Sequence, residues 1–183
     1  MQFKKINGLN SLLILLFVLC SCQSAPVEQV KPADNSNAET FVRVNKLMLK
    51  KDKELIKTYI KRHNFSMTET ESGLWVEVYK PGKGANATNN KTVKIKYTVE
   101  LLDGTKCYSS DSLGIKEFVV GAGRVESGLD EGVLNLKVGS KARLILPPHL
   151  AFGLSGDSKK IPPRSIIVYD IELLSVSDGK FKN

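Results

Sequence analysis

The stretch Phe118-Val-Val-Gly-Ala-Gly-Arg-Val-Glu-Ser-Gly-Leu-Asp-Glu-Gly132 combines a short extended run, a glycine turn and the start of a helix. Ser127 is a favourable N-cap, and Asp130 is placed three residues later to act as its reciprocal partner. The expected buried stripe of this helix consists of Leu129, Val133, Leu134 and Leu136. Because at least two strands are expected on each side of it, we predict a single short helix cradled by a sheet.

Alternating apolar side chains predict the strands of that sheet. The clearest strand covers residues 92–102, where every second side chain from Val93 to Leu101 is apolar. A hairpin turn at Asp103-Gly104 follows it. Further strands are expected at residues 73–79, 106–110, 142–147 and 165–176. Strands dominate and the helix between them is single, so the fold class is α+β with an antiparallel sheet.

The amino terminus has the pattern of a bacterial lipoprotein signal. Lys4 and Lys5 precede a short apolar run over residues 12–19, and Cys22 follows the small residue Ser21. We therefore expect residues 1–21 to be a signal peptide and Cys22 to be the lipidated first residue of the mature chain. This places the protein in the bacterial cell envelope, lipid-anchored and facing the periplasm. The alternative is an ordinary secretory signal.

A tether and a helical arm are expected between the signal and the sheet. Residues 22–40 are rich in Pro, Ser, Asn, Gln and Ala and predict a flexible tether. Residues 41–63 predict a helix, which the polar run at 50–54 could divide into two. Its apolar positions are Val44, Leu47, Met48, Leu55, Ile56, Tyr59 and Ile60. The arm either packs on the domain or stands off as a spacer; the alternative is a surface for a homodimer or another partner.

Composition and residue types exclude several function classes. The net charge is +8, but the lysines are scattered, so we expect no nucleic-acid partner. Cys107 is the only cysteine of the globular part, which therefore has no internal disulfide. The two histidines, His63 and His149, have no metal-ligand or catalytic companions nearby. We expect no metal and no cofactor.

What the inward face offers instead is a set of aromatic and aliphatic side chains. For each one taken singly, a place in the ordinary core is the simplest interpretation. Taken together, a set of short motifs follows in a fixed order from about residue 75 to 176: Tyr97-Thr98, Asp103-Gly104, Ser109-Ser110, Phe118, Gly121, Val125, Gly128 to Gly132, Val138-Gly139, Ala151 to Gly153, Ile161 to Pro163 and Val168 to Leu174. In this order the motifs resemble FKBP-type peptidyl-prolyl cis-trans isomerases.

The resemblance implies an isomerase domain at residues 73–176, built as an antiparallel half-barrel sheet wrapped around one short helix and preceded by the helical arm. It places a proline pocket between sheet and helix. The pocket residues that it implies are Tyr97, Phe118, Val125, Glu126, Leu129, Phe152, Ile161 and Tyr169. Glu126 would contribute its backbone N–H to a substrate carbonyl, which leaves its side chain free to vary.

Several positions depart from the family pattern. Cys107-Tyr108 stands where Phe-Asp is usual, and Phe152 stands where many members have Tyr. Lys116 replaces an aromatic residue of some members, and Leu129 replaces the Trp of the best-studied ones. These changes bear on turnover more than on fold or proline binding. They predict weak isomerase activity and weaker binding of the macrolide inhibitors.

The expected function is prolyl isomerisation that assists the folding of exported proteins, with proline-containing polypeptides as substrates. The lipoprotein signal, the short arm and the run Tyr108-Ser-Ser-Asp111 are similar to the gliding-associated isomerase lipoproteins of Bacteroidetes. The alternative is a non-catalytic proline-binding chaperone, or an interaction module of an envelope or motility assembly.

Overall fold

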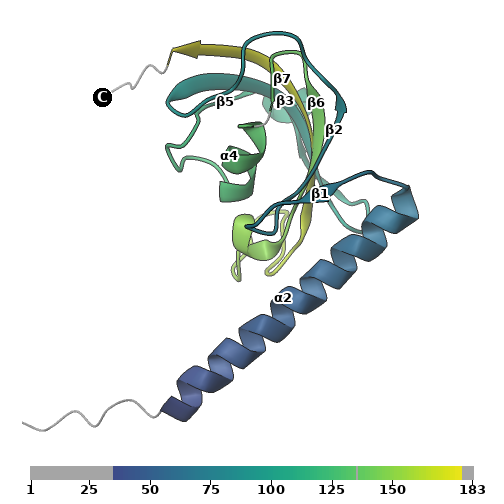
Figure 1. Cartoon of the computed structure of the whole chain (residues 1–183), viewed down its shortest axis with the longest axis vertical. Helices are drawn as coiled ribbons and strands as arrows, with labels where there is room; N and C mark the ends of the chain where they lie inside the picture. The colour runs from purple at the N-terminus through teal and green to yellow at the C-terminus, as the bar shows by residue number, and fades with distance from the viewer. Residues whose placement is uncertain (1–34, 135, 179–183) are drawn as a thin grey trace, which may run out of the picture. The chain divides into compact units, whose positions relative to one another are not determined.

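A computed structural model describes residues 35–134 and 136–178 (Figure 1). The predicted signal peptide, Cys22 and most of the predicted tether lie outside these residues. The chain divides into two units, Met1–Glu39 and Thr40–Asn183, and every strand of the described residues lies in the second. Among the described residues, no helix combines the length and the apolar character that a membrane span requires.

The helices and strands follow the order expected from the sequence, with three short additions. The first part of the chain forms α2 (Asn35–His63), β1 (Thr68–Glu69), β2 (Trp75–Lys80), β3 (Lys91–Leu101), β4 (Lys106–Ser109) and α3 (Ser110–Leu113). The second part forms β5 (Lys116–Val119), α4 (Ser127–Val133), β6 (Lys141–Leu146), the 3-10 helix η1 (Pro148–Leu150) and β7 (Ile167–Asp178). Strand β1, helix α3 and η1 have too few residues to show a periodic pattern, and the sequence did not predict them.

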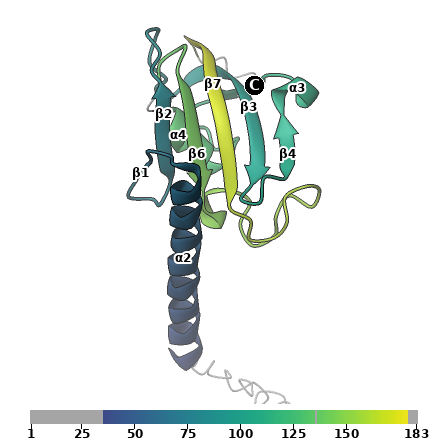
Figure 2. The same cartoon turned by 90° about the vertical axis from the view of Figure 1, so that its right-hand side faces the viewer.

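The strands form one antiparallel sheet in the order β1-β2-β6-β7-β3-β4. Figure 2 shows β2, β6, β7, β3 and β4 side by side. Strand β3 is the centre of the site: β7 pairs along one edge, and β5 and β4 divide the other edge between them. The antiparallel sheet with a short helix is confirmed. Because β5 pairs with the first half of β3, it carries the chain back towards α4.

Helix α4 lies inside the curve of the sheet, as Figure 1 shows, and its side chains form the main core with the inner face. Leu129 and Val133 are fully buried, as predicted. Gly128 and Gly132 face β6, where an added Cβ would lie 2.6 Å from Leu146 Cγ and 2.5 Å from Leu144 Cδ1. Two glycines on this side therefore let the helix approach the sheet closely.

Two details of the predicted helix are wrong. The first helical residue is Ser127 and the N-cap position belongs to Glu126, with no side-chain cap hydrogen bond. The Asp130 carboxylate instead accepts from the Gly121 N–H at 2.8 Å, which holds the glycine turn against the helix. Leu134 is 39% exposed, because the helix ends at Val133 and Leu134 points about 100° away from that buried side chain.

Helix α2 is one continuous helix, so the polar run at 50–54 does not divide it, and it begins at Asn35 rather than at residue 41. Its second half packs on the outer face of the sheet. The cluster there joins Ile56 and Tyr59 to Ile145, Ile166 and Val168. The expected packing of the arm on the domain is therefore found for this half of the helix.

The same half of α2 is held by charge. Asp52 is buried and accepts two hydrogen bonds from the Arg164 guanidinium, at 2.8 and 3.0 Å. Arg164 belongs to the loop that carries Ile161, and its backbone N–H donates to Gly153 O at 3.0 Å. The helix is thus linked through one ion pair to the loop between η1 and β7.

Candidate active site

The structure brings the eight residues implied by the resemblance to the region between α4 and the inner face of the sheet. Five are buried in the main core: Tyr97, Phe118, Leu129, Ile161 and Tyr169. Val125 and Phe152 are half-buried and pack against that core. Glu126 lies beside them at the start of α4. The placement agrees with a pocket, and the role of each residue stays a prediction.

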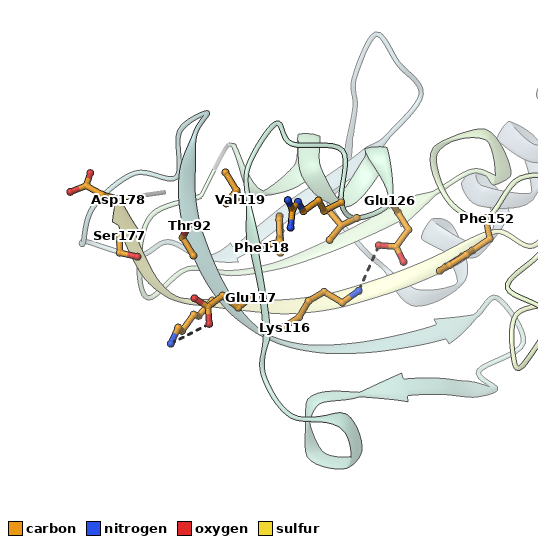
Figure 3. A pocket seen from close by; sticks show the side chains of 12 residues that line it. Thr92, Lys116, Glu117, Phe118, Val119, Glu126, Phe152, Ser177 and Asp178 are labelled. Atoms are coloured by element: carbon orange, nitrogen blue, oxygen red, sulfur yellow. Dashed lines mark ion pairs between the residues drawn. The ribbon is translucent and has the colours of Figure 1, made fainter. Parts of the chain in front are cut away.

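A cavity of about 1090 Å³ opens at this place. Four of the eight residues line it, namely Phe118, Val125, Glu126 and Phe152, as Figure 3 shows for the three that it labels. Tyr97, Leu129, Ile161 and Tyr169 do not line it and form the core behind it. The cavity also runs along β3 and β7 to Thr92 and Asp178, well beyond the predicted pocket.

Lys116 is the polar residue of the site that the resemblance did not assign. It lies on β5, and its Nζ is 5.0 Å from the centroid of the Tyr97 ring and 5.5 Å from that of Tyr169. The ammonium donates to the Tyr169 hydroxyl at 3.2 Å and lies 3.7 Å from Glu126 Oε2. Figure 3 shows Lys116 and Glu126 pointing toward one another across the cavity wall. A cation over two aromatic rings is an attractive arrangement.

The Glu126 side chain makes contacts of its own, for which the resemblance gave no expectation. It is only 10% exposed and accepts a hydrogen bond at 3.1 Å from the Tyr169 hydroxyl through Oε1. Oε2 is buried and has no hydrogen-bond partner in the described part of the chain. The backbone N–H of Glu126 likewise has no acceptor among residues 35–134 and 136–178, so it remains available to a substrate carbonyl.

The two tyrosines behind the cavity, Tyr97 and Tyr169, are held neutral. Their rings lie 6.2 Å apart between centroids and are tilted by 46°. Burial raises the pKa of the Tyr169 hydroxyl, and the Glu126 carboxylate raises it further because it would repel a phenolate. Burial and the same carboxylate raise the pKa of Tyr97. Both hydroxyls therefore stay protonated at physiological pH.

At the edge of the site, Tyr108 and Asp157 form a pair that joins β4 to the loop after η1. The Tyr108 hydroxyl donates to Asp157 Oδ2, while Oδ1 accepts the N–H groups of Lys159, Lys160 and Ile161. Burial opposes ionisation of Asp157, but these hydrogen bonds outweigh it and lower its pKa to about 2. A carboxylate is thus present near Tyr108, although the sequence has none at position 108 itself.

Among the described residues of the site, no nucleophile is paired with a base. His149 contacts the backbone O of Ser72 at 3.0 Å, and His63 stacks on Phe65, so both histidines lie elsewhere. No group of three or more metal-ligating side chains occurs in the described ranges. What the arrangement offers is an apolar wall, a spare backbone donor at Glu126, and the Lys116–Glu126 ion pair. Those features suit binding of an uncharged, conformationally mobile group.

Comparison with known proteins is consistent with this geometry. Residues 83–174 match the family of FKBP-type peptidyl-prolyl cis-trans isomerases. FK506-binding protein 1A of Emericella nidulans is 43% identical over 107 residues, which are 57% of this chain and 99% of that protein. The peptidyl-prolyl cis-trans isomerase Fkbp12 of Drosophila melanogaster is 42% identical over 106 residues, 57% of this chain and 98% of its own.

A solved structure shares the fold over a longer part of the chain. FkpA from Escherichia coli superposes with a TM-score of 0.62, at 24% sequence identity. The match covers 97% of this chain and 85% of that one. It therefore extends the likeness of the fold beyond the residues that the family shares.

Proposed function

The chain belongs to the FKBP-type peptidyl-prolyl cis-trans isomerase family, and we propose that it catalyses this isomerisation on exported polypeptides while anchored to a membrane. The observation that carries the choice of site is the cavity between β5 and α4, where Phe118, Val125 and Phe152 line the same space as Glu126, whose backbone N–H has no acceptor in the described part of the chain. An Xaa-Pro segment has the matching features: an apolar ring, and the carbonyl of the proline itself, which needs one donor and is not part of the rotating amide.

The chemistry needs no nucleophile. Rotation about the prolyl bond faces a barrier of about 18–20 kcal/mol that arises from amide resonance, and unaided it takes on the order of tens to hundreds of seconds. The twisted amide is less polar than the planar one, so an apolar pocket that excludes water favours it. Binding the twisted form more tightly than the planar form lowers the barrier.

The test is a peptide assay with a matched pair of variants. The full chain in detergent micelles should accelerate cis-to-trans conversion of a short Xaa-Pro peptide. Phe152→Ala should lose most of the acceleration because it removes a half-buried wall of the cavity. Leu154→Ala should not, because Leu154 is 73% exposed and lies outside the cavity in the same loop.

No acceleration over the buffer rate at high micromolar protein would refute the catalytic assignment. If the chain then still prevented aggregation of an unfolded client, and did so equally with Tyr97 and Phe152 replaced by Ala, the non-catalytic chaperone function would take its place. Equal loss of activity in both loop variants would show that the effect does not come from the cavity.

The membrane anchor rests on the sequence around Cys22, which is outside the described residues. The charged start, the apolar run at 12–19 and the small residue before Cys22 support lipidation at this position. Cys22→Ser should abolish incorporation of labelled palmitate and release the protein from the membrane fraction of a bacterial host. Cys20→Ser is the matched control and should do neither. Release by both variants, or by neither, would contradict the assignment of Cys22.

The first half of α2 supports a further role as a contact with a second copy of the chain. Phe41 is 70% exposed and Leu47 is 62% exposed, although Ile56 and Tyr59 of the same helix are buried. Apolar side chains that are exposed to solvent on a helix favour association with another apolar surface. Light scattering on the chain in detergent would show a dimer, and Phe41→Glu with Leu47→Glu should return it to a monomer. A monomeric wild type would exclude the contact.

A further inference from the structure

The wall of the cavity carries a hydrogen-bond donor that the assigned site does not use. Lys116 is 25% exposed, and among the described residues its Nζ donates to one group only, the Tyr169 hydroxyl at 3.2 Å. An ammonium has three donors. Glu126 Oε2 lies 3.7 Å away, which is an ion pair but too long for a hydrogen bond. The Lys116 ammonium, which lines the cavity, therefore still has N–H groups that can donate a hydrogen bond.

The position of this cation is fixed from several sides. Tyr97 on β3 and Tyr169 on β7 lie below it as aromatic rings, at 5.0 and 5.5 Å from Nζ. Glu126 at the start of α4 neutralises its charge. The other two cations that line the cavity differ: Lys94 is paired with Glu117 in an exposed ion pair, and Arg124 is exposed. Of these three cations, Lys116 is the one that is held in a fixed position over the rings of Tyr97 and Tyr169.

Rotation of a prolyl amide creates an acceptor that the planar substrate lacks. In the planar bond the nitrogen lone pair is delocalised into the carbonyl. As the bond twists, the lone pair returns to the nitrogen, which then accepts a hydrogen bond. A donor placed at that nitrogen stabilises the twisted state and not the planar one, which is the condition for catalysis. A donor at the carbonyl oxygen has the opposite effect, because the planar amide places more negative charge there.

We propose that Lys116 is a catalytic residue of this isomerase, and that its ammonium donates a hydrogen bond to the prolyl nitrogen as the bond twists. No proton is transferred and no covalent bond forms. Glu126 and Tyr169 act as positioning residues, since they hold the Lys116 ammonium over the two tyrosine rings and leave at least one of its N–H groups free to donate. The inference rests on the isomerase function and adds a residue to it.

The experiment compares variants of Lys116 in the full chain, with kcat and KM measured on one Xaa-Pro peptide by exchange spectroscopy. Lys116→Met keeps the length of the side chain and removes the donor, and Lys116→Arg keeps a cationic donor. Lys116→Phe introduces the aromatic residue that some members of the family carry. Lys96→Met is the matched control: Lys96 is an exposed lysine of neighbouring β3, paired with Asp111 at 3.2 Å, and does not line the cavity.

The expected result is a loss of kcat in Lys116→Met and Lys116→Phe of about tenfold to a hundredfold, the range of a hydrogen bond from a charged group. KM should change little, because the contact forms only in the twisted state. Lys116→Arg should keep most of the activity and Lys96→Met all of it. The Arg variant keeps the test decisive if either apolar variant does not fold.

Three outcomes would overturn the proposal. If Lys116→Phe or Lys116→Met is as fast as the wild type or faster, the ammonium only makes the pocket more polar. If the loss lies entirely in KM, the residue binds the planar and the twisted substrate equally. If Lys116→Arg is as slow as Lys116→Met, the donor is not what matters. An inactive wild type is a different result, since it would refute the isomerase function itself.

Discussion

Replacing Ile56 by Ala should destabilise the whole domain, whereas the same change at the neighbouring Leu55 should not. Ile56 is 1% exposed and packs with Tyr59 against Ile145 and Val168 on the outer face of the sheet. Leu55 is 46% exposed on the same turn of α2. The two variants remove similar side chains from adjacent positions, so any difference between them reports the packing of the helix on the sheet.

The magnitude follows from the burial. Ile→Ala removes three carbon atoms, and at ~0.8 kcal/mol for each buried carbon the transfer part is about 2.4 kcal/mol. The cavity that remains adds to this, because a packed cluster relaxes only in part, so a total of about 3–4 kcal/mol is expected. Leu55→Ala should change the free energy of unfolding by less than about 0.5 kcal/mol, as for other exposed positions.

The measurement is urea unfolding of the full chain in detergent, followed by the fluorescence of the single tryptophan, Trp75, which packs in the same cluster. A shift of the midpoint for Ile56→Ala with an unchanged m-value would show that helix and sheet unfold together. Equal stability of the two variants would refute the reasoning. So would a lower m-value in Ile56→Ala, because the helix would then detach before the sheet unfolds.

Three further predictions concern the loop and the pocket. Arg164→Gln should lower the free energy of unfolding by about 1–3 kcal/mol in urea titrations, because it leaves the buried Asp52 carboxylate without its cation; an unchanged midpoint would contradict the ion pair. The pKa of Asp157 is lowered from 3.8 to about 2, so the stability that it contributes is complete above pH 4 and is lost as the pH falls through 2. Acid titrations of wild type and Asp157→Asn should therefore converge toward pH 2, and a constant difference between them would exclude this cause. Phe152→Tyr should lower KM for Xaa-Pro peptides about two- to tenfold, since it supplies the hydroxyl donor common in the family; a higher KM would show that the half-buried ring cannot accept a polar group.

The inner face of the sheet could be predicted because its signal is local. In β3 every second side chain from Val93 to Val99 is buried, and a two-residue period is enough to assign the strand and its face. The helix that follows Glu126 could also be predicted, from a short apolar stripe at helical spacing. Its cap could not, since Ser127 and Asp130 satisfy the local pattern equally well whether or not a glycine turn elsewhere competes for the carboxylate.

Burial of the outer face of the sheet could not be predicted from a periodic sequence pattern, because it depends on contacts with a distant segment. Leu144, Ile145 and Leu146 are consecutive and all buried, as are Ile167 and Val168. Such runs indicate strands covered on both faces, which was the available signal for the docking of α2. It does not say which segment supplies the cover, because that depends on where a helix more than 80 residues away lies.

The candidate site was also predictable only in part. Family motifs located the apolar wall, because those positions are defined by order along the chain. The pairing of Lys116 with Glu126 joins β5 to the start of α4, and its geometry depends on how strand and helix are placed in space. The departure at Lys116 is visible in the sequence, but its partner is not, since the resemblance implies only a backbone role for Glu126.

The docked half of α2 has a consequence for reading other members of the family. Residues 83–174 carry the shared pattern, yet Ile145 and Val168 within that region are covered by a helix that lies before it. A member without such a helix would present these two positions to water, and polar side chains should replace them there. In other members of the family, apolar residues at the positions of both Ile145 and Val168 should therefore indicate that a covering helix is present. This inference needs no alignment of the segment that precedes the shared region.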